Sequence, residues 1–326
     1  MKKIAFLLLL LPFLLSACAA PAPSECEIFA MDTLMSVKVW GDDALLGLVT
    51  SEINALDSAL SAVDADSAIY GLNENGSAVL DASLCDLLRQ SVALSEATDG
   101  AFDPTVYPLV QLWGFPDGVY RVPDETELAN AVVGTEHIHF SDSTVSLDKG
   151  CAIDLGAIGK GYAARRCREL LAENGAQAAL LSLGGNVQTL GSKPDGSDWV
   201  VGIADPHFPS SAIAKLTFQG SLALVTSGSY QRYFELDGVR YHHILDPATG
   251  RPAESGLSSV TILAEDAAVA DAYSTALFVM GLEKGATFWR ETGSFEAVFL
   301  TTDGTIYATQ GAAELLSGCE FEVIAP

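Results

Sequence analysis

Positive charge is scarce in this sequence. Its 326 residues include 17 lysines and arginines against 42 aspartates and glutamates, which gives a formal net charge of −25 at pH 7. A chain this acidic repels the phosphates of nucleic acids and of anionic lipids, so neither is expected as a partner. A polyanionic ligand would need local compensation, from a metal ion or from backbone N–H groups.

Cysteine is scarce as well, and the few cysteines follow no pairing pattern. Besides Cys18 the sequence has Cys26, Cys85, Cys151, Cys167 and Cys319. These five are widely spaced, form no C-x-x-C motif and are odd in number. The sequence therefore predicts neither a disulfide framework nor a zinc site.

The N-terminus has the features of an exported lipoprotein. Lys2 and Lys3 precede an apolar run, Ile4–Leu15. This run is shorter than the roughly 20 residues that a membrane-spanning helix needs. The next residues, Leu15–Cys18, read Leu-Ser-Ala-Cys, which has the form of a lipobox. The alternative is an ordinary secretory signal followed by a chance cysteine.

Three segments follow from this interpretation of the N-terminus. We expect residues 1–17 to be a lipoprotein signal peptide and residues 18–28 to be a lipidated tether. Residues 29–326 would then form a single catalytic unit. The protein is expected to be extracytoplasmic and lipid-anchored to the cell membrane through Cys18.

Strand and helix patterns alternate irregularly along the rest of the chain, without the strict order of repeated β-α-β units. This mixture predicts an α+β fold. Helices are expected at 44–60, 83–98, 126–133, 160–173 and 267–280. Strands are expected at 29–40, 178–183, 200–203, 212–218, 223–226, 230–236 and 258–263, and hairpins within 137–147 and 298–308. Ser83 and Gly281 are expected caps, and the prolines of 102–118 predict an irregular loop.

A glycine-rich segment, Asp154–Tyr162, lies where an apolar strand meets a helix. Gly156, Gly159 and Gly161 would let the backbone approach a ligand closely and direct N–H groups toward it. The segment is not a Walker A loop, because it has an acidic residue in place of the first glycine and a glycine after the lysine. A phosphate-binding turn and a tight turn without a ligand both fit this pattern.

Asp271 and Thr275 are four residues apart on the expected helix 267–280, so their side chains share one face. Both offer the hard oxygen ligands that Mg²⁺ prefers, with room left for water and phosphate. The alternative is a carboxylate near the helix N-terminus and a threonine that bonds its own backbone.

Tyr241–Gly250 contains two adjacent histidines, His242 and His243, before an Asp-Pro turn. A histidine here could transfer a proton, because its ordinary pKa lies near neutrality. Adjacent residues of a strand face opposite ways, so at most one of the pair should face a given site. A structural role for both is the alternative. His137 and His139 share another strand face but have no metal-ligating partners in the sequence pattern.

Two further segments are candidates for ligand contacts. Ser227–Tyr230 follows a strand but lacks the G-x-S-x-G frame of a nucleophile turn, so we interpret it as a loop near a ligand. Asp103, together with Phe102, Trp113 and Phe115, offers a carboxylate and rings that suit an aromatic ring system. Such rings can equally well form part of the core.

Taken together, these segments resemble the ApbE family of FAD:protein FMN transferases, bacterial flavinyltransferases. The match is joint and ordered along the chain, which makes it specific although no single segment suffices. The departures are small: Asp32 stands where some members have Gly, and Gln231 where Glu is commoner. The matching segments are 31–33, 101–105, 113–115, 154–162, 183–186, 201–206, 226–230, 243–250, 270–272 and 280–281.

The resemblance implies a fold and a reaction. The fold would be ApbE-like and T-fold-related, with mixed sheets packed against helices. Members bind FAD as substrate with Mg²⁺, transfer FMN to a Thr or Ser hydroxyl of an acceptor protein through a phosphoester bond, and release AMP. The implied metal ligands are Ala157, through its carbonyl, with Asp271 and Thr275. The implied flavin-nucleotide contacts are Met31, Ala101, Phe102, Asp103, Asp154, Lys160 and Leu245. His243 and Asp271 would be catalytic.

Two alternatives stay open from the sequence. One is an exported lipoprotein that binds FAD without turnover, and the other is an FAD pyrophosphatase that produces FMN and AMP. The presence of His243, Asp271 and Thr275 argues against binding alone. The sequence does not separate transfer from hydrolysis, because the acceptor lies on another protein. By resemblance, that acceptor would be an exported redox protein with a Thr/Ser flavinylation motif.

Overall fold

The computed structural model describes residues 22–208 and 210–326. The expected signal peptide and the Cys18 anchor therefore lie outside the described residues. The last part of the expected tether, residues 24–28, belongs to a strand, Ser24–Ala30, that pairs with residues 33–39. Within these two ranges, no helix combines the length and the apolar character that crossing a membrane requires.

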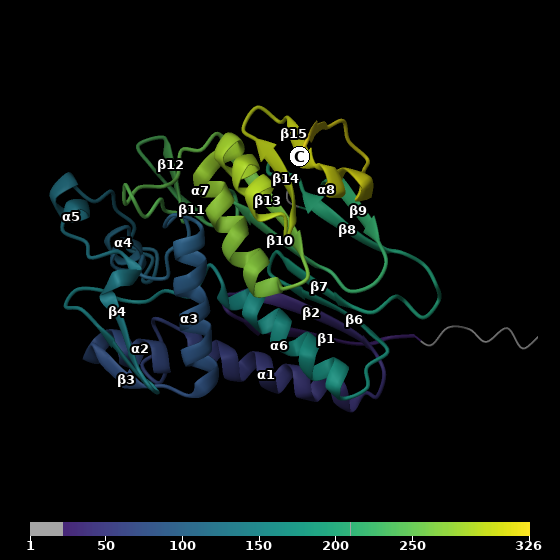
Figure 1. The fold of residues 1–326 in the computed structure, drawn as a ribbon, viewed down its shortest axis with the longest axis horizontal. Helices are drawn as coiled ribbons and strands as arrows, with labels where there is room; N and C mark the ends of the chain where they lie inside the picture. The colour runs from purple at the N-terminus through teal and green to yellow at the C-terminus, as the bar shows by residue number, and fades with distance from the viewer. Residues whose placement is uncertain (1–21, 209) are drawn as a thin grey trace, which may run out of the picture.

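The largest sheet of the described chain has nine strands and runs through the centre of the molecule (Figure 1). Every neighbouring pair is antiparallel except β15 and β17. In spatial order the strands are β1 (Ser24–Ala30), β2 (Thr33–Trp40), β6 (Ala178–Leu183), β7 (Asn186–Leu190), β10 (Ala223–Gly228), β13 (Leu257–Ala264), β14 (Glu296–Thr301), β15 (Ile306–Thr309) and β17 (Glu322–Ile324).

Three long helices pack on one face of this sheet: α1 (Ala44–Leu60), α6 (Gly159–Glu173) and α7 (Ala267–Thr292) (Figure 1). In α1 the buried residues Leu45, Val49 and Ile53 recur every four positions and form one apolar stripe. α6 and α7 pack against each other, which brings the glycine-rich segment beside Asp271.

The opposite face of the sheet is partly covered by a smaller sheet of β16 (Leu316–Ser317), β9 (Ala212–Phe218) and β8 (Trp199–Ala204), together with α8 (Gln310–Leu315). Trp199, Leu216 and Leu224 belong to the hydrophobic cluster between these layers. The outer face of β10 therefore belongs to a different core from its inner face, which packs against α7.

A second region precedes α6 and packs beside the helices. It contains α2 (Ala68–Asn75), β3 (Ser77–Val79), α3 (Ala82–Ala97), α4 (Tyr107–Leu112), α5 (Glu125–Ala129), η1 (Thr135–His137), β4 (Ile138–Ser141) and β5 (Thr144–Leu147). Leu88 and Val145 from this region share one buried cluster with Val225 and Ile262 of the large sheet. The α+β expectation is confirmed, and one hydrophobic core joins the two regions.

The expected strand at 29–40 is wrong in one respect: the chain folds there into the hairpin of β1 and β2. Met31 and Asp32 form its turn, with φ values of 49° and 56°. Left-handed values at both central residues are what a tight hairpin turn requires. Neither residue is a glycine, so the sequence gives no turn signal there and the alternation of apolar residues predicts one continuous strand.

Three further expectations need correction. Asp81, and not Ser83, caps α3, since its side chain accepts the N–H of Leu84. The proline-rich loop contains α4, because Pro108 lies in the first turn, where its missing N–H costs nothing. Gly281 has a non-helical backbone (φ 79°, ψ 176°), but it kinks α7 and the helix resumes to Thr292.

The remaining expected elements are present with small shifts of their ends, except that the helix expected at 126–133 ends at Ala129 and the strand expected at 230–236 is shorter. That strand is β11 (Tyr233–Leu236), which pairs with β12 (Val239–His242) in a hairpin that the sequence patterns do not predict. The register places Tyr233 opposite His242. His243 therefore follows directly after the end of a strand.

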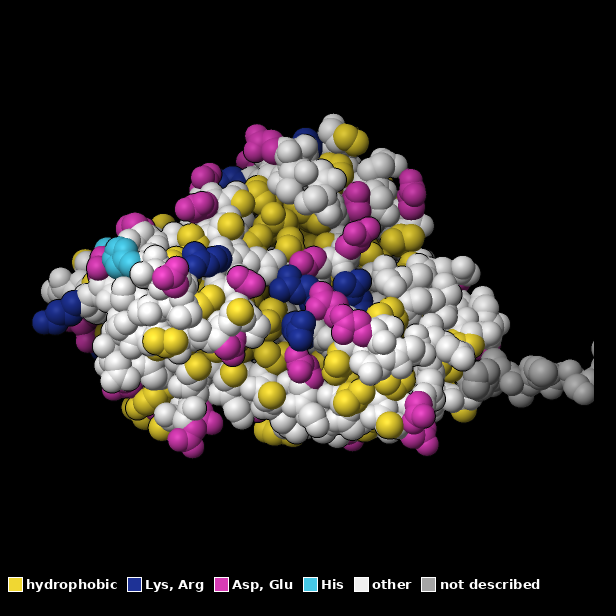
Figure 2. Space-filling model, turned by 60° about the horizontal axis from the view of Figure 1, so that its bottom comes forward, with side chains coloured by type: hydrophobic (Ala, Val, Ile, Leu, Met, Phe, Trp, Pro, Cys, Tyr) yellow, Lys and Arg dark blue, Asp and Glu magenta, His cyan; other side chains and the backbone are white. Residues whose placement is uncertain are grey.

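Acidic side chains are scattered over the face drawn in Figure 2, and several Lys and Arg side chains lie among them near its middle. Apolar side chains gather in a hollow above these charges (Figure 2). The ion pairs given by the structure include Arg165 with Asp266 at 2.8 Å and Arg166 with Glu52 at 3.3 Å, both on the α6 side. The few cations of the chain are thus partly used to join α6 to its neighbours.

Candidate functional site

The candidate site lies at one end of the large sheet, where β6 ends, β7 begins and β10 ends. Here the start of α6 meets the first half of α7. A Cβ on Gly161 would lie 2.1 Å from the Ala267 carbonyl oxygen and 2.6 Å from Asp271 Cβ. Only glycine permits this approach, which lets the Gly161 N–H donate to Asp271 Oδ2 at 2.7 Å.

Asp271 is a buried carboxylate, 3% exposed, on the sheet-facing side of α7. Burial raises its pKa, against the Lys160 ammonium, the Gly161 N–H and the Asn186 amide, which lower it. Asn186 begins β7 and is 1% exposed, and its Nδ2 has no well-formed hydrogen bond among the described residues.

Hydroxyl groups continue the site one helical turn after Asp271. Thr275 Oγ1 lies 3.2 Å from Ser227 Oγ, which comes from β10. Ser227 Oγ in turn lies 2.8 Å from Ser274 Oγ. The structure thus places Asp271 and Thr275 on one face, as their spacing predicts. Ala157 lies in the turn before α6, four residues ahead of Gly161, and is partly buried.

Asp154 and Lys160 occupy the two ends of the glycine turn. Asp154 Oδ1 accepts the N–H of Gly156 at 2.7 Å, and its own N–H donates to the Pro104 carbonyl at 2.8 Å. Lys160 Nζ donates to the Gly156 carbonyl at 3.4 Å. Burial raises the pKa of Asp154, against the positive charges of Lys160 and Arg232.

The Lys160 ammonium also lowers the pKa values of Asp271 and His243. One cation therefore acts on all three of these predicted site residues. The direct contacts are local to the glycine turn: Lys160 Nζ donates to the Gly156 carbonyl, and the Gly161 N–H donates to Asp271 Oδ2.

His243 lies just after β12 and is partly buried. Its Nδ1 is 3.0 Å from the Arg232 carbonyl oxygen. A carbonyl only accepts, so Nδ1 carries the hydrogen and Nε2 of the neutral ring keeps a free lone pair. Burial lowers the pKa of His243 to about 4, and the Lys160 charge acts in the same direction. The ring is therefore neutral at physiological pH and able to accept a proton at Nε2.

His242 has different surroundings. Its Nε2 lies 3.2 Å from the Ala253 carbonyl oxygen, and its ring packs edge-on against Phe278, with centroids 5.5 Å apart. Burial lowers the pKa of His242 as well. The two histidines thus contact different parts of the molecule, and the catalytic assignment of His243 stays a prediction.

The other predicted flavin contacts have local partners of their own. Met31 lies in the β1–β2 turn, and its N–H donates to Asp57 Oδ1 of α1 at 2.9 Å. Asp103 Oδ1 accepts from the Thr105 hydroxyl at 2.6 Å, and burial raises the pKa of Asp103. Ala101 is partly buried and packs against the main core. Their roles as flavin contacts stay predictions.

The aromatic residues near Asp103 belong to hydrophobic cores. Phe102 is 1% exposed within the main core, and Trp113 and Phe115 are no more than 2% exposed in a separate cluster. Leu245 belongs to that second cluster. The burial of these rings supports the alternative that they form part of the core.

Four residues of the site are not identifiable from the sequence: Arg232, Asn186, Ser227 and Ser274. Asn186 and Ser227 lie in segments that resemble the family, 183–186 and 226–230, but which way their side chains point depends on strand register. Arg232 supplies both the carbonyl that orients His243 and a positive charge that lowers the pKa of Asp154. No local pattern signals such a contact between distant segments.

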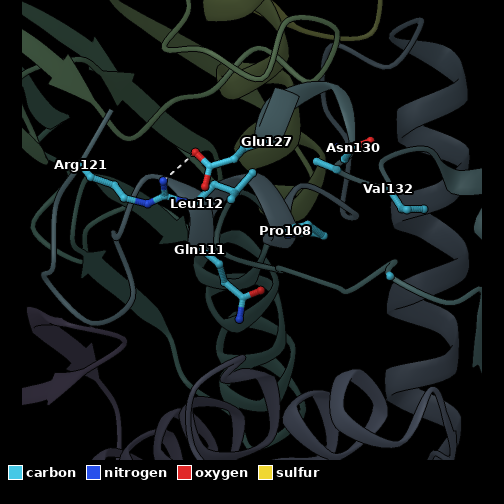
Figure 3. A pocket seen from close by; sticks show the side chains of 9 residues that line it. Pro108, Gln111, Leu112, Arg121, Glu127, Asn130 and Val132 are labelled. Atoms are coloured by element: carbon cyan, nitrogen blue, oxygen red, sulfur yellow. Dashed lines mark hydrogen bonds and ion pairs between the residues drawn. The ribbon is translucent and has the colours of Figure 1, made fainter. Parts of the chain in front are cut away.

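Two cavities of the described chain do not include Asp271, Thr275 or His243. One, of about 330 Å³, lies beside α4 and α5, where Arg121 and Glu127 pair at 2.7 Å (Figure 3). The other, of about 220 Å³, lies on the outer face of the sheet beside Gly185 and Thr226. The candidate site is therefore identified by its side chains and not by either of these cavities.

Within residues 22–208 and 210–326, no group of three or more His, Cys, Asp or Glu side chains is arranged to hold a metal ion. His137 and His139 both bond Asp148, at 2.9 Å each, on the surface. A cation at Asp271 would instead rely on one carboxylate supplemented by hydroxyl and carbonyl oxygens.

The fold and the site together define an α+β protein with a buried carboxylate, a glycine turn and a neutral histidine at one sheet end. This chain belongs to the ApbE family, whose model matches residues 31–299. It is 37% identical to a Treponema pallidum protein named FAD:protein FMN transferase, over 89% of this chain and 88% of that protein.

Solved structures agree with this assignment. An ApbE protein from Thermotoga maritima has a TM-score of 0.84 and 34% identity, covering 90% of this chain and 99% of its own. The flavinyl transferase ApbE from Pseudomonas stutzeri has a TM-score of 0.80 and 31% identity, covering 90% and 96%. The expected family and fold are confirmed.

Proposed function

We propose that this chain is an FAD:protein FMN transferase that moves FMN from FAD to a Thr or Ser hydroxyl of an acceptor protein. The observation that carries the proposal is the buried Asp271 carboxylate, which accepts the Gly161 N–H at the glycine turn that also holds Lys160. The identity with relatives named for this activity supports it.

The residues present fit a Mg²⁺ ion. Asp271 is a buried carboxylate, 3% exposed, whose charge is only partly compensated by its neighbours. Thr275 Oγ1 and the Ala157 carbonyl would add neutral oxygens, a donor set that suits a hard cation. When bound, the ion would supply charge stabilisation for the pyrophosphate and for the AMP leaving group.

The protein's own groups supply the rest of the reaction. Lys160 would bind phosphate oxygens, which an acidic protein must neutralise locally. The glycine N–H groups that the sequence predicts to face a ligand instead donate within the protein, those of Gly156, Gly159 and Gly161 to Asp154, Leu155 and Asp271. His243 Nε2 would accept the proton of the incoming hydroxyl as its oxygen bonds the phosphorus of the FMN half. The bond from that phosphorus to the AMP phosphate breaks, and AMP leaves with the electron pair.

Hydrolysis is the nearest competing reaction, because His243 could take a proton from water in the same position. Incubating the purified protein with FAD, Mg²⁺ and a candidate acceptor domain separates the two. We expect the intact mass of the acceptor to increase by one FMN unit while AMP appears in equal amount. AMP with free FMN and an unmodified acceptor would identify a pyrophosphatase, and FAD that stays intact would indicate binding alone.

We also propose that the protein is lipid-anchored outside the cytoplasm, on the support of the N-terminal pattern Leu15–Cys18. Cys18→Ser should abolish lipidation and move the protein from the membrane fraction to the soluble fraction. Cys26→Ser is the matched control, since Cys26 belongs to β1 and its Sγ lies 3.9 Å from the Thr50 hydroxyl. Membrane retention of the Cys18 variant at the native level would contradict the anchor.

A further inference from the structure

We propose that Ser227 is a positioning residue that turns the Thr275 hydroxyl so that its lone pairs face the candidate cation site. This inference rests on the metal site of the proposed function. Ser227 comes from β10 and Thr275 from α7, and their hydroxyl oxygens are 3.2 Å apart. The expected loop placement of Ser227, after the strand, is wrong, because Ser227 lies within β10 and is paired with Val260.

The directions of the hydrogen bonds follow from one fixed acceptor. Ser274 Oγ lies 2.8 Å from the carbonyl oxygen of Asp271, which cannot donate, so the single hydrogen of Ser274 is used there. Ser227 Oγ, 2.8 Å from Ser274 Oγ, must then be the donor of that pair. With its hydrogen used, Ser227 can only accept from Thr275.

The chain therefore runs in one direction, from Thr275 to Ser227 to Ser274 to the helix backbone. Its result is that the Thr275 hydrogen points toward β10 and both lone pairs of Oγ1 are left for the site. A cation bound at Oγ1 would make the Thr275 hydroxyl hydrogen more acidic, and Ser227 Oγ is placed to accept the hydrogen bond that it donates.

Burial and rigidity keep this arrangement in place. Ser274 is 0% exposed and Ser227 is 9% exposed, so water has little access to replace either hydroxyl. Ser227 is paired with Val260 of β13 in the antiparallel ladder, which fixes its position, while the pairing of β10 with β7 ends two residues earlier at Val225. Without Ser227, Thr275 would be free to bond the carbonyl four residues earlier in its own helix, as helical threonines do.

The test is a titration of cation binding that does not depend on turnover. Mn²⁺, which also prefers hard oxygen ligands, would be followed by electron paramagnetic resonance in the presence of ADP. ADP supplies pyrophosphate oxygens but has no flavin to transfer. We expect Ser227→Ala to weaken Mn²⁺ binding by about tenfold or more, within the 10–100-fold range of outer-shell partners.

Thr226→Val is the matched control, because Thr226 is the neighbour of Ser227 on the other face of β10 and its hydroxyl bonds Thr261 of β13. It should bind Mn²⁺ as the native protein does. In a Thr275→Val background, Ser227→Ala should have no further effect on binding, since its partner is already gone. Thermal melts of all variants would identify any that fail to fold, and Ser227→Cys would then replace Ser227→Ala.

These measurements test the positioning role of Ser227 separately from the metal site of the proposed function. Native binding by Ser227→Ala, or an equal loss in both backgrounds, would overturn the positioning role while leaving the metal site intact. Mn²⁺ binding that is the same in the native protein and in Asp271→Asn would overturn the metal site, and this inference with it.

Discussion

Asp271→Asn should lower AMP release from FAD by at least about 10³-fold while the protein stays folded. A bound cation is worth several kcal/mol of transition-state stabilisation, and each 1.4 kcal/mol is about tenfold in rate. The asparagine keeps an oxygen that can accept the Gly161 N–H, which donates to Asp271 at 2.7 Å, but it removes the negative charge. The measurement is AMP formation at saturating Mg²⁺, with a thermal melt alongside.

Asp266→Asn is the matched control on the same helix. Asp266 caps α7 through the N–H of Ala268 and pairs with Arg165 at 2.8 Å, outside the candidate site. Asparagine caps helices as well as aspartate does, so this variant should lose only a partly exposed ion pair. AMP release at the native rate by Asp271→Asn, in buffer with or without a chelator, would show that the buried carboxylate is not the metal ligand.

The parts of the fold that could be predicted from the sequence are those with local signals. The apolar stripe of α1 recurs with helical spacing, and the helix expected at 160–173 is present as α6. The pair Asp271 and Thr275 was readable because four residues make about one helical turn. In each case the information lies within a dozen residues. The apolar strand expected to lead into the glycine-rich segment is wrong, because Ala152 forms only an isolated bridge with Val106.

The parts that could not be predicted depend on pairing between distant segments. The Gly161 N–H reaches a carboxylate 110 positions away, and Ser227 meets Thr275 across 48 positions. Strand register decides that Ser227 faces α7 while Thr226 faces the opposite layer, and nothing in the Ser-Gly-Ser segment sets that register. The turn at Met31 gives no sequence signal because its left-handed backbone uses no glycine.

The second large effect is expected at His243. His243→Ala should reduce FMN transfer by about 10²–10⁴-fold, which is the usual contribution of a general base. His242→Ala should stay within a few-fold of the native rate, although its melting temperature should fall because the ring packs on Phe278. The measurement is the rate of acceptor labelling by intact mass, at matched fractions of folded protein.

The pH profile gives the assignment an independent check. Burial and the Lys160 charge lower the pKa of His243 to about 4, so the folded ring is neutral and basic above that value. It loses its capacity to accept a proton only as the pH falls toward 4, and not near the ordinary histidine value. The acid limb of kcat/KM, which reports groups of the free enzyme, should therefore contain no step near pH 6.5 from this residue.

The two histidine variants, compared with each other, locate the proton acceptor. Equal losses in His242→Ala and His243→Ala would mean that the segment after β12 acts as a structural unit, and that neither ring is a specific base. Full activity in both would place the proton acceptor elsewhere. Asp271 would then be the next candidate, because burial raises its pKa and its carboxylate lies within the same cluster around Lys160. In that case Asp271→Asn would remove both a metal ligand and a base, and its loss should exceed that of Thr275→Val by the contribution of proton transfer.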